Sequence, residues 1–357
     1  MDTYPPNTSP PICPKCGLPL DIDGLDPSVD IITGLGGRAG VFKYLDPGIF
    51  SKYVSLGEGD TPIIYNGDLK LYFKLDYLNP SGSFKDRGSA SAVSIAYMFG
   101  FKDVVEDSSG NAGASISLYS SSIGIKPHIF IPRDAPSGKA SLIRLLGGII
   151  HYSNDRAEAY NDALGYSRKN SYYYIGHVIN PYFNTGLRSI AYEVFNHNLK
   201  PDNIIVPVGS GGLFLGLYNG FKDIHLNGLI DEMPRIHAVE VAGYERISRM
   251  VSGVTIYVDK VSKLADGLRV EGPPRILEIR DALDKCGGGV IVVDDEEIRE
   301  ALKILLSRGY IIEPTSAVAY AGYLKGLEYN IIDKGIDLII LTGSGFKMID
   351  MLLELIK

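Results

Sequence analysis

The chain of 357 residues has no tryptophan, only three cysteines and no long apolar run. Three cysteines are too few for a disulfide framework in a chain of this length. No stretch approaches about 18 uninterrupted apolar residues, so no membrane-spanning helix is expected. The first residues have neither a basic start nor an apolar core, so we expect no secretory signal. These absences predict a soluble, cytoplasmic globular protein.

An excess of basic charge is missing as well. Lysine and arginine number 35 against 42 acidic residues, the net charge is −7, and no basic block occurs. This balance disfavours nucleic acid and anionic membrane surfaces as partners. The apolar content of 45% argues against disorder, and the length suggests about two domains at a prior of roughly 150 residues each.

Short apolar runs alternate with amphipathic stretches from about residue 70 onward. This alternation predicts an α/β fold in which helices cover parallel sheets. The expected strands are 69–75, 103–106, 128–131, 149–152, 172–175, 204–208, 236–241, 289–293 and 338–341. The expected helices are 112–122, 137–146, 157–169, 186–196, 213–221 and 295–307. Residues 1–54, rich in proline, glycine and aspartate, are expected to form an irregular extension.

The strongest local motif surrounds Lys85. A turn signal, Asn79-Pro-Ser-Gly, leads into Ser83 as an N-cap and then into a helical stretch. Lys85 would therefore lie in the first helical turn, where the positive end of the helix dipole disfavours an ammonium group. An amine that loses its proton easily suits Schiff-base chemistry. The alternative is a solvated Lys-Asp-Arg face on an ordinary helix.

A second motif, Ser108-Ser109-Gly110-Asn111, joins an expected strand to a helix of small residues. Its short side chains and backbone N–H groups could hold a carboxylate or a ring hydroxyl, or could simply cap the helix.

Two further turns follow expected strands. The turn Gly209-Ser210-Gly211-Gly212-Leu213 could bring backbone amides to a phosphate at a helix N-terminus. It lacks the Lys-Ser/Thr of a P-loop and the spacing of a dinucleotide motif, so a single phosphate fits best. Thr342 follows the last strand, where its hydroxyl could hydrogen-bond a neutral ring nitrogen. An ordinary tight turn is the alternative in both places.

Metal chemistry has little support. Cys13 and Cys16 form half of a zinc knuckle, but a closed site needs four ligands and no second pair follows. Cys286 lies far away and is expected to be an inert thiol, and we expect no bound metal.

Taken together, these motifs resemble pyridoxal-phosphate enzymes of the tryptophan-synthase-β type (fold type II), and among them the threonine synthases. The resemblance spans about residues 40–350, and its motifs follow the family's order. They are 55–62 (Ser-Leu-Gly-Glu-Gly-Asp-Thr-Pro), 79–88, 108–113, 180–182 (Asn-Pro-Tyr), 209–213, 313–317 (Glu-Pro-Thr-Ser-Ala) and 341–345.

This resemblance implies a role for each matched residue. Lys85 would hold pyridoxal 5'-phosphate covalently and later move protons. The glycine turn would cradle the cofactor phosphate, Asn111 would bind the ring hydroxyl, and Thr342 would face the pyridine nitrogen. The implied cofactor contacts are Lys85, Asn111, Gly209, Ser210, Gly211, Gly212, Leu213 and Thr342. The implied substrate contacts are Ser83, Ser108, Ser109, Gly110, Asn180, Arg188 and Arg269.

The resemblance also implies two α/β domains with the cofactor in the cleft between them. Residues 55–90 and 179–357 would form the large domain, and residues 91–178 a small mobile domain whose closure excludes water. A hydroxyl at the ring nitrogen does not enforce a protonated pyridinium, which favours elimination or replacement over transamination. A homodimer is expected.

The implied enzyme is a lyase that converts O-phosphohomoserine and water to threonine and phosphate. Many threonine synthases have Asn-Pro-Tyr-Arg, and that arginine helps to hold the substrate phosphate, whereas Phe183 stands here. Arg188 or Arg269 would have to compensate. Alternatively, the enzyme is a threonine or serine deaminase, or a β-replacement enzyme similar to cysteine synthase. A non-catalytic binding protein conflicts with an intact Lys85.

The two neighbouring cysteines give a first testable prediction. Because two thiolates cannot complete a tetrahedral zinc site, elemental analysis of the purified protein should find no stoichiometric zinc. Cys16→Ser should leave folding, followed by circular dichroism, intact. One zinc per chain would contradict this prediction and would mean that ligands elsewhere were missed.

Overall fold

The computed structural model describes residues 3–22, 25, 27–135, 137–252 and 261–356. The chain forms two compact units. Unit 1 comprises Met1–Gly59 and Asn79–Ser189, and unit 2 comprises Asp60–Leu78 and Ile190–Lys357. The sequence-based boundaries placed 79–90 and 179–189 in the larger domain, whereas here both segments group with unit 1. The reason is that α2 (Lys85–Met98) packs against α3 (Asn111–Ser121) and α6 (Pro181–Leu187).

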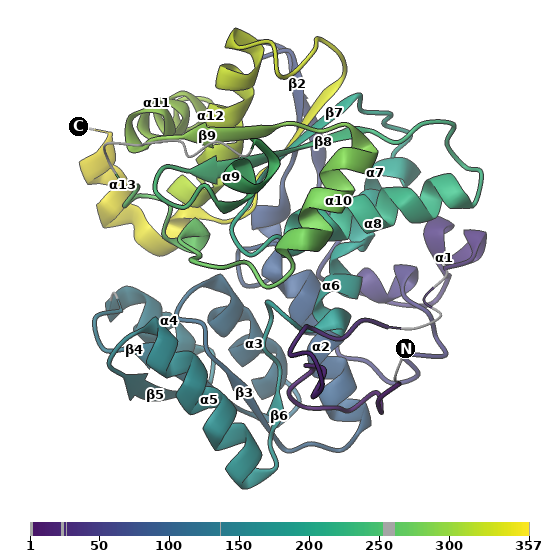
Figure 1. Cartoon of the computed structure of the whole chain (residues 1–357), viewed down its shortest axis with the longest axis vertical. Coiled ribbons are helices and arrows are strands. Elements are labelled where there is room, and N and C mark those ends of the chain that lie inside the picture. Colours follow the sequence, from purple (N-terminus) through teal and green to yellow (C-terminus); the bar gives the residue numbers. More distant parts are fainter. Residues whose placement is uncertain (1–2, 23–24, 26, 136, 253–260, 357) are drawn as a thin grey trace. The chain divides into compact units, whose positions relative to one another are not determined.

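Unit 1 is built on a parallel sheet with the strand order β5-β4-β3-β6 (Figure 1). Its strands are β3 (Asp103–Glu106), β4 (Lys126–Pro132), β5 (Ile149–Ser153) and β6 (Tyr173–Tyr174). Its other helices are α1 (Val29–Thr33), η1 (Gly40–Tyr44), α4 (Ser137–Leu145) and α5 (Arg156–Asn170). The expected irregular extension therefore contains two short helices, and its Phe42 and Phe50 are fully buried in the core of this unit.

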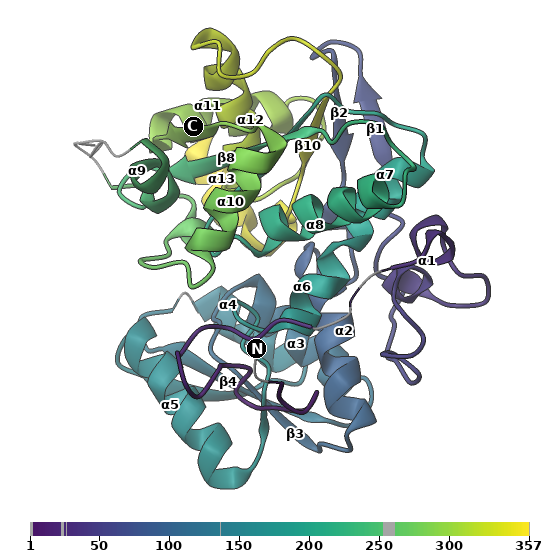
Figure 2. The same cartoon turned by 45° about the vertical axis from the view of Figure 1, so that its right-hand side comes forward.

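Both faces of the inner strands β3 and β4 are buried, as is usual for parallel strands. Val104 and Ile129 point into the cluster that includes residues of α2 and α3. Their neighbours Val105 and Phe130 point the other way, into a cluster with α5. This alternation explains why the strands appear in the sequence as short, continuous apolar runs. In Figure 2, α5 lies on one side of the strands β3 and β4, and α2 and α3 lie on the other.

Unit 2 contains a six-stranded sheet with the order β1-β2-β10-β7-β8-β9, in which only β1 runs antiparallel to its neighbour. Its strands are β1 (Ile63–Asn66), β2 (Leu71–Lys74), β7 (Asn203–Pro207), β8 (Arg235–Val241), β9 (Val290–Val293) and β10 (Asp337–Ile340). The expected α/β class with parallel sheets is confirmed. β1 was not predicted, because its edge position leaves Ile64 and Tyr65 exposed and its sequence without clear alternation.

Helices cover the sheet of unit 2, and α12 packs across β7, β8, β9 and β10. The helices are η2 (Asp76–Leu78), α7 (Ser189–Asn196), α8 (Gly212–Leu226), α9 (Arg246–Ser252), η3 (Asp266–Leu268), α10 (Ile276–Cys286), α11 (Asp295–Leu306), α12 (Pro314–Glu328), η4 (Gly345–Met348) and α13 (Ile349–Leu355). The single helix expected over 186–196 is two helices, because α6 ends at Leu187 and α7 begins at Ser189. In the described part of the chain, no helix is long and apolar enough to cross a membrane.

Two glycines let α2 and α6 approach closely. A Cβ on Gly88 would lie 2.3 Å from the ring of Phe183, and one on Gly186 would lie 2.2 Å from the backbone oxygen of Arg87. Real side chains do not tolerate such distances, so only glycine fits at either position. The crossing fixes the helix that begins at Lys85.

This crossing gives a second prediction. Gly186→Ala should lower the free energy of unfolding by about 1–3 kcal/mol, because the added methyl group meets the backbone of α2. The matched control is Gly165→Ala in the interior of α5, where a Cβ meets nothing within 4 Å. That substitution should stabilise by about 0.5–1 kcal/mol through helix propensity. Urea unfolding of both variants tests the prediction, and equal stability of the two would contradict it.

Candidate active site

Lys85 lies in the first turn of α2, as predicted, and is its first residue. A network around Asp86 fixes the turn before it. The Asp86 carboxylate is fully buried and accepts hydrogen bonds from the backbone N–H of Ser81 at 2.6 Å and from its hydroxyl at 2.5 Å. It also accepts one from the hydroxyl of Ser115 on α3, at 2.5 Å. The first turn of α2 is thus tied to α3 as well as to its own preceding loop.

Ser83 does not act as the expected N-cap. The residue at that position of α2 is Phe84, and no side chain caps the helix. The hydroxyl of Ser83 is fully buried and has no hydrogen-bond partner among the residues that the structure describes. A buried hydroxyl that lacks a partner is costly unless a ligand completes it. Its expected contact with substrate stays a prediction.

Two aromatic rings lie close to the amine of Lys85. Its Nζ lies 4.7 Å from the ring centre of Phe84 and 5.8 Å from that of Phe183 on α6. Phe183 is almost completely buried, with 1% of its surface exposed. The position at which the resemblance expects an arginine is therefore filled by an apolar side chain beside the lysine, and no cation comes from it.

The loop that follows β3 carries the second predicted motif. Ser108, Ser109 and Gly110 are half-buried, and α3 begins at Asn111 without a capping side chain. A Cβ on Gly113 would lie 2.0 Å from the Ser108 carbonyl oxygen, so this glycine allows the loop to fold tightly onto the helix. The first-turn amides of α3 are suited to an anion such as a carboxylate.

Asn180 has a structural role. Its side chain is fully buried and caps α6 by accepting hydrogen bonds from the N–H groups of Tyr182 and Phe183. Its amide nitrogen donates to the carbonyl of Ile175 at 2.8 Å and to the hydroxyl of Tyr173 at 3.4 Å. These bonds give the side chain a structural role, and its expected contact with substrate stays a prediction.

An ionisable pair that the sequence did not single out lies at the carboxyl ends of β3 and β6 in unit 1. Nδ1 of His177 lies 2.6 Å from Oε1 of Glu106, the last residue of β3, and its backbone N–H donates to Oε2 at 3.2 Å. Burial, and then the Glu106 carboxylate, raise the pKa of Asp107 to about 6. The six histidines follow no motif, so only the pairing of β3 with β6 could have brought His177 to attention.

In unit 2 the glycine turn joins β7 to α8. Gly211 has a positive φ of 88° and precedes Gly212, the first helical residue, and no side chain caps α8. A Cβ on Gly209 would lie 3.0 Å from the Cα of Leu268, so glycine lets these two loops approach. With Ser210 and Leu213, the turn presents first-turn amides of a 15-residue helix, which suits a single phosphate.

Thr342 follows β10 and is 98% buried, with 2% of its surface exposed. Its backbone N–H donates to the hydroxyl of Ser316 at 2.8 Å, but its own hydroxyl has no hydrogen-bond partner among the described residues. Such a hydroxyl fits the neutral nitrogen of a heterocycle. The glycine turn, the Thr342 hydroxyl and Lys85 thus supply donors of the kinds that pyridoxal phosphate requires.

The two arginines considered for a substrate phosphate differ in setting. Arg188 is half-buried and caps the C-terminus of α6, so it is not part of a continuous helix as expected. Arg269 donates from Nε to the hydroxyl of Tyr244 at 3.2 Å, and its guanidinium lies 5.8 Å from the centre of that ring. Their contacts with substrate stay predictions.

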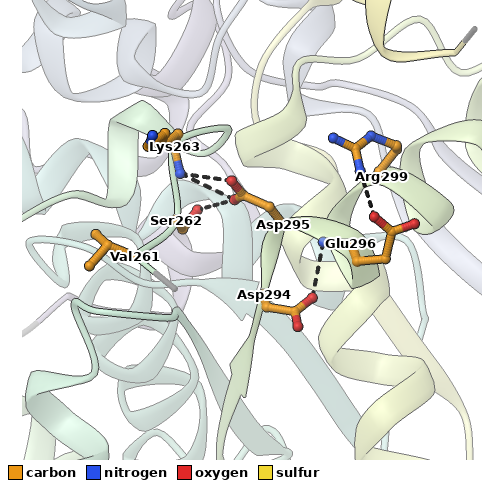
Figure 3. Close-up of a pocket in the computed structure, with 7 residues that line it drawn as sticks. All are labelled: Val261, Ser262, Lys263, Asp294, Asp295, Glu296 and Arg299. Atoms are coloured by element: carbon orange, nitrogen blue, oxygen red, sulfur yellow. Dashed lines mark hydrogen bonds and ion pairs between the residues drawn. The ribbon is translucent and has the colours of Figure 1, made fainter. Parts of the chain in front are cut away.

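A hollow of about 440 Å³ in unit 2 contains none of the predicted site residues (Figure 3). It is lined by Val261, Ser262, Lys263, Asp294, Asp295, Glu296 and Arg299. Its carboxylates at Asp295 and Glu296 are already engaged by neighbouring groups. Asp295 accepts from Ser262 and from the backbone of Lys263, and Glu296 pairs with Arg299 at 2.6 Å. We assign it no chemistry.

Among the described residues, no three His, Cys, Asp or Glu side chains gather in a way that could hold a metal ion. Hydrogen bonds, first from the Tyr4 hydroxyl, lower the pKa of Cys13 to about 7. Burial raises the pKa of Cys286. The absence of zinc at Cys13 and Cys16 stays a prediction.

Comparison with known proteins identifies the family. A model of the pyridoxal-phosphate dependent enzymes matches residues 54–343. A threonine synthase from Methanocaldococcus jannaschii is 33% identical over 327 residues, which is 86% of this chain and 80% of that protein. A threonine synthase from Methanosarcina acetivorans is 29% identical over 352 residues, 92% of this chain and 86% of that protein. The solved structure of maize serine racemase has a TM-score of 0.74 and 25% identity, covering 92% of this chain and 97% of that one.

The chain therefore belongs to the pyridoxal-phosphate dependent enzymes of fold type II, and it is a lyase with this cofactor. Within the family its sequence is similar to the threonine synthases, as the motifs indicated. The predicted fold class, cofactor and enzyme class are confirmed. The roles of individual site residues stay predictions.

The position of Lys85 gives a third prediction. The purified protein should be yellow, and borohydride should fix the cofactor to the peptide that contains Lys85, because reduction makes the covalent link permanent. Lys85→Ala should abolish this labelling, and Lys102→Ala, at an exposed lysine, should not. A label on another lysine would contradict the site assignment.

Proposed function

We propose that this enzyme is a threonine synthase, which converts O-phosphohomoserine and water to threonine and phosphate. The observation that carries the proposal is the likeness to threonine synthases over most of the chain, at up to 33% identity among those compared. Its residues also suit an elimination. The unpartnered Thr342 hydroxyl is suited to a neutral ring nitrogen, which moderates the electron sink and disfavours transamination.

The chain's own residues would divide the work as follows. Pyridoxal phosphate, when bound, withdraws electrons from the α carbon of the substrate. Nζ of Lys85 would remove the α proton. Loss of a β proton would expel the γ-phosphate, and the γ carbon would gain a proton in exchange. The hydroxyl of water would then add at the β carbon, and the remaining proton of water would go to the released phosphate. Lys85 returns the α proton at the end. The loop Ser108–Asn111 would hold the substrate carboxylate throughout.

A second candidate rests on Phe183. Because this buried ring supplies no charge beside Lys85, the substrate could lack a phosphate altogether. Deamination of threonine or serine, or replacement at the β carbon, would need the same lysine, glycine turn and hydroxyl. Closure of the smaller domain, the homodimer and a cytoplasmic location also stay predictions.

A side-by-side assay separates the candidates and is our fourth prediction. The purified enzyme should release phosphate and threonine from O-phosphohomoserine, and Lys85→Ala should abolish this activity while Lys102→Ala retains it. Formation of 2-oxobutanoate from threonine, or of pyruvate from serine, without turnover of O-phosphohomoserine would contradict the proposal and would favour a deaminase.

A further inference from the structure

Glu106 and His177 follow neighbouring parallel strands of unit 1. Glu106 is the last residue of β3, and His177 lies in the loop after β6. The backbone N–H of Ile175 donates to the carbonyl of Val105, so the two strand ends are held in register. Ligands of open α/β sheets bind outside the carboxyl ends of the strands. The pair therefore stands on the edge that also carries the Ser108–Asn111 loop.

The pair is organised so that one ring nitrogen stays available. The carboxylate of Glu106 is fully buried. It is hydrogen-bonded to Nδ1 of His177 and accepts a hydrogen bond from the backbone N–H of the same residue, which fixes the orientation of the ring. The side chain of His177 is 15% exposed, and among the described residues none hydrogen-bonds its Nε2. One nitrogen of this ring is held by a buried carboxylate and the other is accessible, so the ring is oriented to hydrogen-bond a ligand through Nε2.

Phe183 connects this pair to the reactive lysine. The ring centre of His177 lies 5.8 Å from that of Phe183 in an edge-on contact, and Nζ of Lys85 lies 5.8 Å from the same ring. His177 and Lys85 thus border one aromatic side chain. A group bound at Lys85 and a group bound at His177 would therefore share Phe183 as a neighbour.

Neither Arg188 nor Arg269 takes the place of an arginine at position 183. Arg188 follows Phe183 by five residues, a rotation of about 140° around the helix, so the two side chains leave α6 in different directions. An arginine at 188 therefore does not replace one at 183. Arg269 already donates from Nε to the hydroxyl of Tyr244.

We propose that His177 binds the phosphate leaving group of the substrate through Nε2, with Glu106 as its positioning residue. This inference rests on the proposed function. With both ring nitrogens protonated, the imidazolium donates to Glu106 at Nδ1 and to a phosphate oxygen at Nε2. The charge that Phe183 lacks thus comes from a neighbouring loop. The titratable groups beside it are Glu106 and Asp107, and Asp107 is engaged by the Tyr174 hydroxyl at 2.6 Å.

Two variants of His177 separate binding from support. In His177→Asn the amide can still donate to Glu106 but does not reach the position of Nε2. It should raise the KM for O-phosphohomoserine, and the inhibition constant of inorganic phosphate, by about tenfold or more, with a smaller change in kcat. His177→Gln places an amide near Nε2 and should recover part of both. The visible absorbance of the cofactor and the melting temperature of His177→Asn should stay close to those of the unmodified enzyme.

The matched control is His225→Asn, at an exposed histidine on α8, which should change neither constant. The inference is overturned if the unmodified enzyme uses O-phosphohomoserine and His177→Asn leaves both constants unchanged. It is also overturned if Arg188→Ala raises them and His177→Asn does not. If the unmodified enzyme does not turn over O-phosphohomoserine, the proposed function fails first, and this assignment fails with it.

Discussion

The close crossing of α2 and α6 is the constraint on which the active-site half of unit 1 depends. Gly88 and Gly186 leave room for the ring of Phe183 and for the carbonyl of Arg87, and any side chain at either position would push the helices apart. The buried carboxylate of Asp86 then holds the loop that enters α2. The result is a lysine at the first position of a buried helix whose backbone is fixed on two sides. A reactive amine needs such a fixed base if its proton transfers are to be directed.

Both units use the carboxyl ends of parallel strands in the same way. In unit 1, β3 leads into the Ser108–Asn111 loop and β6 leads to His177. In unit 2, β7 leads into the glycine turn and β10 leads to Thr342. This placement follows from the fold, because crossover helices leave the loops at one edge free to vary. Glycines and short hydroxyl side chains occur there because backbone amides and small donors must approach a ligand closely.

Phe183 shows how one substitution changes the electrostatics of a site without removing its framework. The ring is buried and packs onto Gly88, so the close crossing of the helices survives with an apolar residue. An ionisable pair lies beside the ring, formed by the fully buried Glu106 at the end of β3 and by His177 in the loop after β6. Burial, and then the neighbouring Glu106 carboxylate, raise the pKa of Asp107 beside this pair.

The sequence by itself determined the fold class, most of the strands, the cofactor and the place of Lys85 in the first turn of a helix, because these follow from local apolar runs and ordered motifs. It failed for the edge strand β1, which has no clear alternation, and for the break at Arg188, where the nearby glycine, Gly186, lies within α6 and not after its end. Tertiary structure alone decided that the side chain of Asn180 caps α6. It also decided that the hydroxyls of Ser83 and Thr342 have no hydrogen-bond partner among the described residues. It alone brought His177 to Glu106, 71 residues apart in the chain. Such pairings depend on which strands become neighbours, and no local pattern encodes that choice.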